Sequence, residues 1–262
     1  MKTFNHQQSL LKSKMDSKTL TLGSWLTIPH QSIVEILASA GFELLVLDLE
    51  HSAIYFQKTQ EMIGHIQAQG MQGLVRVSSN EPVVIKRSMD IGADGVIVPM
   101  VLNQHEAQKA VDAVRYPPLG NRGVGLSRAQ HYGIGFETYN EWVNSQSVVI
   151  IQVEHIDAVN NLESILGVEG VDGIIVGPYD LSASLGKPGQ FNAPEVVEAL
   201  NRVEEISSKY NKSLGFHVIK PSHSEVTAKV KKGYTFIAFS LDFLFLGDKA
   251  RKEMKSIMHK QK

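Results

Sequence analysis

The chain has 262 residues, a formal net charge of -1 at pH 7, 43% hydrophobic residues, 20% charged residues and no cysteine. This length suits one α/β barrel and is short for two enzymatic domains. The near-neutral charge argues against a nucleic-acid partner. No stretch reaches the ~20 apolar residues of a membrane span. The lack of cysteine excludes disulfides and thiolate nucleophiles.

Residues 1–20 mix Lys, Gln, Ser and Asp and contain no apolar block, so they lack the hydrophobic region of a secretory signal. We expect them to form a frayed lead-in or a short helix. A single catalytic domain is expected over residues 21–262, in a cytoplasmic protein with no membrane partner.

Apolar runs rich in Val, Ile and Leu recur along the rest of the chain, and each is separated from the next by a segment with helical periodicity. Several runs are apolar almost throughout, as is typical of parallel strands covered on both faces. The eight predicted strands are residues 21–27, 43–50, 73–77, 95–101, 148–154, 172–178, 213–218 and 235–242. Such alternation in this length predicts an α/β fold, a single (β/α)₈ TIM barrel, rather than an open doubly wound sheet.

Glycine and proline mark the ends of several predicted helices. Helices are predicted over residues 31–40, 81–91, 193–210 and 248–258. The connection 102–147 is long enough for two helices with the loop 117–132 between them, and connections of this length are often functional.

Polar side chains gather where the predicted strands end, whereas the beginnings of the same runs carry mainly Gly, Ser and Thr. These polar side chains are Asp48, His51, Arg76, Gln152, Glu154 and Asp180. In a (β/α)₈ barrel the active site is built at the carboxyl ends of the strands. The chemical difference between the two ends of the barrel therefore predicts an enzyme.

Glu154 and Asp180 would stand on adjacent parallel strands, where two carboxylates repel each other unless a cation lies between them. Oxygen ligands in a chain without thiolates favour Mg²⁺ or Mn²⁺ over Zn²⁺. Asp180 could instead cap the helix that follows it. Arg76 needs an anion, either an acid of this cluster or a substrate. His51 is either a satisfied structural histidine or a base.

The segment 115–125 contains two prolines, three glycines and two arginines. Proline restricts the backbone and glycine allows close approach, so this loop is expected to hold a defined shape. It lacks the glycine spacing and the downstream acid of a dinucleotide-binding motif. The loops near His217 and Asp242 carry no glycine cluster, which disfavours phosphorylated substrates.

The motifs together resemble one known family. The matching segments are residues 46–51, 74–77, 91–93, 98–101, 115–125, 152–154 and 167–186. From about residue 21 to about residue 252 the chain resembles the HpcH/HpaI aldolases, which are metal-dependent class II pyruvate aldolases. The resemblance implies reversible cleavage of a 4-hydroxy-2-oxo acid to pyruvate and an aldehyde through a metal-stabilised enolate. The implied partners are therefore a small-molecule 2-oxo acid and an aldehyde.

The resemblance also implies roles for individual residues. Glu154 and Asp180 would ligate the divalent metal, Mg²⁺ or Mn²⁺, with Co²⁺ as a third option. Arg76 would stabilise the enolate oxygen, and His51, oriented through Asp90, would be the acid/base. The supporting and substrate-binding positions implied in the same way are Asp48, Gln152, Gly177, Pro178, Tyr179 and Asp180.

Four places depart from the family's pattern. Tyr179 stands where Ala is common and Leu49 where a small residue is usual. His155 replaces Thr, and Phe216 with His217 replaces a smaller, glycine-containing pattern. Tyr179 is expected to fill space or donate a hydrogen bond where the acceptor aldehyde binds, which leaves the identity of that aldehyde open. His155 and His217 are expected to be buried, hydrogen-bonded histidines.

Three other functions stay open. One is an oxaloacetate-type decarboxylase, and another is a CoA-ester lyase, which would need a longer chain with an extra C-terminal element. The third is a non-catalytic barrel, against which the retained metal and acid/base residues argue. The resemblance further implies a homo-oligomer, a hexamer built as a trimer of dimers, with the C-terminal helix exchanged between subunits. The apolar stretch 243–246 before that helix needs burial.

Overall fold

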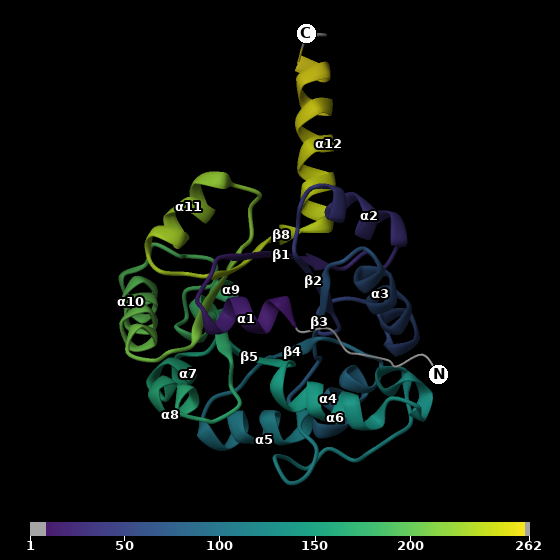
Figure 1. The fold of residues 1–262 in the computed structure, drawn as a ribbon. Helices are drawn as coiled ribbons and strands as arrows, with labels where there is room; N and C mark the ends of the chain where they lie inside the picture. The colour runs from purple at the N-terminus through teal and green to yellow at the C-terminus, as the bar shows by residue number, and fades with distance from the viewer. Residues whose placement is uncertain (1–8, 260–262) are drawn as a thin grey trace.

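The computed structural model describes residues 9–259, which form a closed barrel of eight parallel strands in the order β1 to β8 (Figure 1). The strands are β1 (Thr21–Leu26), β2 (Leu44–Asp48), β3 (Gln72–Arg76), β4 (Gly95–Val98), β5 (Val148–Val153), β6 (Gly173–Val176), β7 (Ser213–Val218) and β8 (Phe236–Leu241). Each begins within one residue of its predicted start. The predicted (β/α)₈ barrel is confirmed.

Most of the helices surround the barrel, whereas the first lies across one end of it and the last projects away from it (Figure 1). They are α1 (Leu10–Asp16), α2 (Gln31–Ser39), α3 (Phe56–Ala68), α4 (Pro82–Asp90), α5 (Gln104–Val114), the 3₁₀ helix η1 (Arg128–Gly133), α6 (Phe136–Ser145), α7 (Ile156–Asn160), α8 (Leu162–Leu166), α9 (Pro178–Ser184), α10 (Pro194–Ser208), α11 (His223–Lys231) and α12 (Asp242–His259). The connection from β4 to β5 contains α5 and α6, as predicted. No helix within residues 9–259 combines the length and the apolar character needed to cross a membrane.

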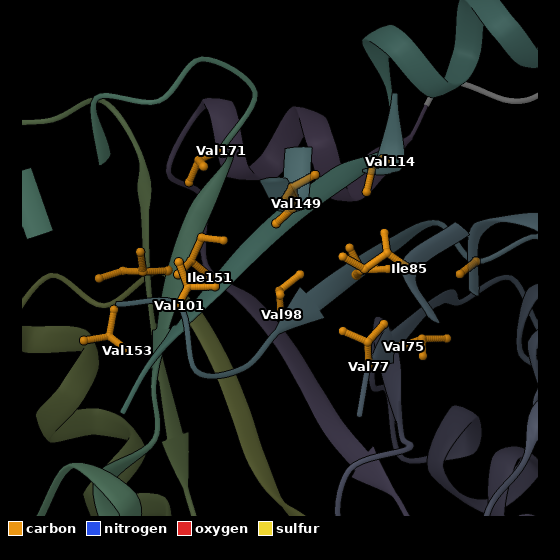
Figure 2. Packing of buried hydrophobic residues seen from close by; sticks show 14 of the residues in the cluster. Val75, Val77, Ile85, Val98, Val101, Val114, Val149, Ile151, Val153 and Val171 are labelled. Atoms are coloured by element: carbon orange, nitrogen blue, oxygen red, sulfur yellow. The ribbon is translucent and has the colours of Figure 1, made fainter. Parts of the chain in front are cut away.

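The strand side chains divide between two cores because successive residues of a strand point to opposite faces. Ile97 of β4 and Ile150 of β5 belong to the inner core, inside the barrel. Their neighbours Val98 and Ile151 belong to the outer core, where the strands pack against the helices (Figure 2). All four side chains are fully buried. The same alternation decides which residues at the strand ends face the barrel axis.

The described part of the N-terminal lead-in is a helix, one of the two forms expected from the sequence. Leu11 and Met15 of α1 are buried in the inner core. A Cβ at Gly173, at the start of β6, would lie 2.8 Å from the Met15 Cε, so glycine makes room for this helix. Since α1 packs against the amino-terminal ends of the strands, ligands have access from the carboxyl end.

The last helix is longer than predicted, and the predicted start at residue 248 was wrong. α12 begins at Asp242, whose Oδ1 accepts a hydrogen bond from the Phe243 N–H at 2.8 Å. Gly247 disfavours a helix in isolation, but here it lies inside one. The helix projects away from the barrel (Figure 1). Its exposed apolar side chains include Leu246, Met254, Ile257 and Met258.

Candidate active site

A cavity of about 290 Å³ opens at the carboxyl end of the barrel. Most of the predicted site residues line it, namely Asp48, His51, Arg76, Gln152, Gly177, Pro178, Tyr179 and Asp180. Leu74 and Ile150 lie in the inner core, so side chains two residues further along β3 and β5 also face inward. This alternation brings Arg76 and Gln152 to the mouth of the barrel.

Arg76 is held by Asp48 at the end of the neighbouring strand. Strand register places the two residues side by side. The guanidinium donates through Nε to Oδ1 at 2.9 Å and through Nη2 to Oδ2 at 2.6 Å. Burial alone would raise the pKa of Asp48, but the hydrogen bonds and positive charge of Arg76 outweigh it, and the pKa lies below its usual value. Arg76 is thus a fixed cation in the cavity wall.

Trp25, which was not predicted as a site residue, packs its ring against the guanidinium of Arg76. Arg76 Cζ lies 4.3 Å from the centroid of the Trp25 ring, a cation–π contact. Trp25 is an inward-facing residue of β1 and is buried. A buried tryptophan in an apolar strand is usually core, so only its inward position near a strand end could have drawn attention to it.

His51 lies in a turn that Asp48 organises. Asp48 Oδ1 accepts hydrogen bonds from the N–H groups of Glu50 at 3.0 Å and His51 at 3.1 Å. The His51 ring is mainly exposed, and its Nε2 lies 3.6 Å from Glu50 Oε2. The same oxygen lies 3.4 Å from Arg76 Nε. Burial raises the pKa of Glu50 to about 7, against the lowering effect of Arg76 and with help from nearby carboxylates. Glu50, which was not predicted as a site residue, therefore links His51 to Arg76.

Glu154 follows β5 and is buried. Its Oε1 accepts from the Met100 N–H at 2.8 Å, and its Oε2 accepts from the side-chain amide of Gln152. Met100 has a φ of 52°, a strained conformation for a residue with a side chain, and no glycine marks this position in the sequence. Burial raises the pKa of Glu154, the two hydrogen bonds lower it, and the charge of Asp180 raises it; the net shift is upward.

Gly177 separates the two predicted metal ligands. A Cβ at this position would come within 3.3 Å of Glu154 Oε2, so glycine avoids crowding the carboxylate from this side. Gly177 is also the N-cap residue of α9, which begins at Pro178, and no side chain caps this helix. Asp180, in the first turn, is therefore not the helix cap that the alternative interpretation required.

The acidic residues fit a divalent cation bound partly by protein and partly by other oxygen ligands. Glu50 Oε2 is buried and has no hydrogen-bond partner within residues 9–259. Glu154 and Asp180 add carboxylate oxygens, the ligands that Mg²⁺ prefers. No three His, Cys, Asp or Glu side chains of the described chain form a full ligand set. Glu154 and Asp180, together with water and substrate oxygens, would match the one or two carboxylates by which proteins typically hold Mg²⁺.

Asp90 is not among the described residues that line the cavity. Its Oδ1 accepts a hydrogen bond from Arg122 Nη2 at 2.6 Å, and Arg122 Nη1 also donates to the Tyr139 hydroxyl at 2.9 Å. Arg122 is buried, so the loop 115–125 has the defined shape expected from its prolines and glycines. The pairing of Asp90 with His51 stays a prediction.

The two unusual histidines differ in their surroundings. His155 is partly exposed rather than buried, because its Nδ1 accepts from the Asp157 N–H at 3.1 Å and so caps α7. His217 faces inward from β7, lines the cavity and packs edge-on against Trp25, with ring centroids 5.4 Å apart. Its Nε2 is shielded from solvent and has no hydrogen-bond partner in the described chain. The hydrogen bond expected for this histidine is therefore not formed at Nε2.

Tyr179 lies at the rim of the cavity and is about half exposed. Its ring packs edge-on against Phe191, with centroids 5.0 Å apart at 78°. The apolar residues that line the cavity on the side of β7 and β8 are Ile219, Leu241 and Phe243. The chain's departures from the family pattern at Tyr179 and His217 therefore both lie at this cavity.

Comparison with known proteins gives consistent matches along almost the whole chain. The sequence pattern described as HpcH/HpaI aldolase/citrate lyase matches residues 21–246. A hydroxypyruvate/pyruvate aldolase of Roseobacter denitrificans is 34% identical over 236 residues, which cover 90% of this chain and 91% of that protein. A 5-keto-4-deoxy-D-glucarate aldolase of Escherichia coli is 34% identical over 88% of this chain and 90% of that protein. The crystal structure of a HpcH/HpaI aldolase/citrate lyase family protein from Burkholderia cenocepacia superposes with a TM-score of 0.89 at 30% identity, covering 95% of this chain and 98% of that one.

Proposed function

The chain belongs to the HpcH/HpaI aldolase/citrate lyase family and is an aldolase, and we propose that it reversibly cleaves a 4-hydroxy-2-oxo acid to pyruvate and an aldehyde. The names of relatives that match about nine-tenths of the chain support pyruvate as one product. The relatives are named for different substrates, so the aldehyde has to be argued from this chain's own residues.

The observation that carries this proposal is a fixed cation facing an acidic pair. Arg76, which donates two hydrogen bonds to Asp48, lines the same cavity as Asp180. Glu154 lies next to Gly177, where a Cβ would come within 3.3 Å of Glu154 Oε2. Cleavage of the substrate develops negative charge on its 2-oxo oxygen. Groups that stabilise charge present mainly in the transition state lower the barrier.

Glu154 and Asp180 would hold the divalent metal, Mg²⁺ or Mn²⁺, with Co²⁺ as a third option. When bound, the metal supplies a Lewis acid for the carboxylate and keto oxygens of the 2-oxo acid. The raised pKa of Glu154, which burial causes, supports this assignment, because a nearby cation would favour its charged form.

Arg76 would donate to the 2-oxo oxygen as that atom becomes an enolate oxygen. In the cleavage direction a base takes the proton of the C4 hydroxyl, the C3–C4 bond breaks, and its electrons move into the enolate. Protonation of C3 then yields pyruvate. His51, exposed at the cavity mouth, would exchange the C3 proton, with Asp90 as its predicted partner. Asp48 would position these groups.

The first turn of α9 would hold the substrate carboxylate. Gly177 and Pro178 begin this turn. The N–H groups of Tyr179 and Asp180 in such a turn have no acceptor within the helix. Gln152 would keep Glu154 oriented through its amide.

We also propose a homo-oligomer, a hexamer with α12 exchanged between subunits. Residues 251–258 of this helix are all exposed, and the helix projects from the barrel (Figure 1). Met254, Ile257 and Met258 are 56%, 53% and 65% exposed. An apolar set of this kind on a projecting helix fits burial against another copy of the chain.

Substitution of the acidic pair tests the proposed function. Glu154→Gln and Asp180→Asn should leave a folded protein that has lost most Mn²⁺ binding by calorimetry and most pyruvate release from a 4-hydroxy-2-oxo acid. Glu141→Gln, at an exposed position of α6, is the matched control and should behave as wild type. Wild-type turnover in either site variant, after chelation and resupply of Mg²⁺ or Mn²⁺, would show that the assignment is wrong.

A further inference from the structure

A second cavity, of about 580 Å³, lies at the amino-terminal end of the barrel, away from the active site. It is lined there by Gln72, the first residue of β3, and by Asp94, which precedes β4. The start of α1 contributes Leu10, and η1 contributes Arg128 and Tyr132. The volume is larger than the 290 Å³ of the active-site cavity and lies within the range of small-molecule sites. The two cavities have no lining residue in common within the described chain.

Arg128 is the only arginine or lysine among the described residues that line this cavity, and it lacks a carboxylate partner. Four of the chain's seven arginines are buried or half-buried. Three of these four form ion pairs with aspartates, namely Arg76 with Asp48, Arg115 with Asp172, and Arg122 with Asp90. Arg128, the fourth, forms no ion pair with a side chain of residues 9–259, and residues 1–8 contain no acidic side chain.

The charge of Arg128 is therefore not balanced by a contact with this chain. Burial lowers the pKa of Arg128, and the charges of Tyr132 and Asp94 offset this effect only in part. An arginine nevertheless stays protonated at neutral pH. A half-buried cation at the wall of a cavity is stabilised by an anion that enters the cavity.

The guanidinium is held in place and still has donors to spare. Nη1 donates to the Ile91 carbonyl at 3.0 Å, and Nη2 donates to Gln67 Oε1 at 2.9 Å. A Cβ at Gly92 would collide with Nη1, so glycine allows this close approach. A guanidinium has five N–H groups, and the other three have no acceptor within the described residues. Such a planar fork matches the two oxygens of a carboxylate.

The turn that carries Tyr132 has an unusual backbone. His131 and Tyr132 have φ values of 49° and 57°, so two successive residues with side chains are left-handed. This conformation is costly without glycine, and strained backbone of this kind gathers at ligand clamps. The Tyr132 N–H donates to the Ser127 carbonyl at 2.8 Å, which fixes the turn. The Tyr132 side chain lines the cavity and is 71% exposed, so a ligand can reach its ring.

We propose that this cavity binds an aromatic monocarboxylate, with the carboxylate on Arg128 and the ring against Tyr132. Leu10, Met71 and Trp142 add apolar surface to the same cavity. Aromatic rings pack well against such side chains, in offset or edge-on geometry. The proposal does not rest on the proposed aldolase function, because it concerns a different cavity.

Asp94 limits the charge of the ligand. Burial raises its pKa to about 6, so the carboxyl group is mostly ionised at neutral pH. Its Oδ2 accepts hydrogen bonds from the Gly73 N–H at 2.7 Å and from Gln67 Nε2 at 3.2 Å. A phosphate ester carries up to two negative charges at neutral pH and would be repelled more strongly than a carboxylate. A singly charged carboxylate is therefore the better match.

The test measures binding by calorimetry with three probes: naphthalene-2-carboxylate, its uncharged alcohol counterpart naphthalen-2-ylmethanol, and acetate, which has the charge but no ring. Wild type should bind the naphthalene carboxylate about tenfold more tightly than either other probe. Arg128→Gln should weaken that binding about tenfold. Tyr132→Asn should weaken it several-fold, since asparagine tolerates the left-handed backbone but lacks the ring. Arg202→Gln, at an exposed position of α10, is the matched control and should bind as wild type.

Saturating pyruvate with Mg²⁺ separates this cavity from the active site, where a carboxylate could also bind. The affinity for naphthalene-2-carboxylate should not change when pyruvate is present, and displacement by pyruvate would overturn the proposal. Wild type that binds the carboxylate and the alcohol equally, or that does not bind the carboxylate, would overturn it too. So would unchanged binding in a folded Arg128→Gln protein. If that variant does not fold, Tyr132→Asn decides, because it leaves the Arg128 contacts intact, and unchanged binding there contradicts the proposal.

Discussion

Replacing Arg76 by lysine keeps a positive charge at the cavity but removes the planar guanidinium. Lysine cannot reproduce the bidentate contact with Asp48, with bonds of 2.9 and 2.6 Å, or the flat contact 4.3 Å from the Trp25 ring. One lost hydrogen bond to a charged group corresponds to about 1.5–3 kcal/mol. Because about 1.4 kcal/mol is a factor of ten, loss of the donor to the enolate oxygen should lower the exchange rate by about 10²-fold.

The assay follows deuterium entering the pyruvate methyl group by proton NMR in the presence of Mn²⁺ or Mg²⁺. Arg87→Lys is the control, because Arg87 Cζ lies 3.9 Å from the Phe56 ring centroid on the exposed side of α4, away from the cavity. We expect the exchange rate to fall only in the Arg76 variant. Equal rates in wild type and a folded Arg76→Lys protein would refute the role given to the guanidinium.

Three further predictions concern stability, acceptor size and assembly. Burial raises the pKa of Asp94 from 3.8 to about 6, so the folded state favours its protonated form. The free energy of unfolding should therefore fall by about 3 kcal/mol as the pH rises through this interval. In Asp94→Asn, urea unfolding should show no such pH-dependent loss. Parallel pH profiles for the two proteins would contradict this. Tyr179→Ala should raise kcat/KM for long aldehydes and leave methyl exchange unchanged, whereas an equal effect on short and long aldehydes would place Tyr179 in the pyruvate site or the fold. Light scattering should return a mass well above the 28.9 kDa of one chain, and Met254→Glu with Ile257→Glu should lower it; a wild-type monomer at micromolar concentration would count against assembly through α12.

The barrel could be predicted from sequence because its strands are buried on both faces and read as short apolar runs between helices. Helix boundaries were predicted less accurately where the local helix preference of the sequence and the tertiary packing disagree. α12 begins at Asp242, whose carboxylate accepts the Phe243 N–H group, whereas the sequence prediction placed the apolar stretch 243–246 before a helix that starts at residue 248.

The placement of a side chain at the cavity could be predicted where strand alternation alone decides its direction, as for Arg76 and Gln152. Site contacts were not predicted where they depend on closure of the barrel or on an unusual backbone conformation. Trp25 reaches Arg76 across the mouth from a strand that is not its neighbour, and Met100 aims its N–H at Glu154 from a left-handed conformation that no glycine announces. Neither feature leaves a local signal in the sequence.

The measurement that tests the central claim most directly is methyl-proton exchange of pyruvate in deuterated solvent, without aldehyde, for wild type and His51→Ala. Metal-dependent enolisation of pyruvate predicts rapid exchange in metal-replete wild type, loss of exchange on chelation, recovery with Mg²⁺ or Mn²⁺, and little exchange in His51→Ala at any metal concentration. Exchange that survives both chelation and the His51 substitution, or that is missing from metal-replete wild type, would contradict it.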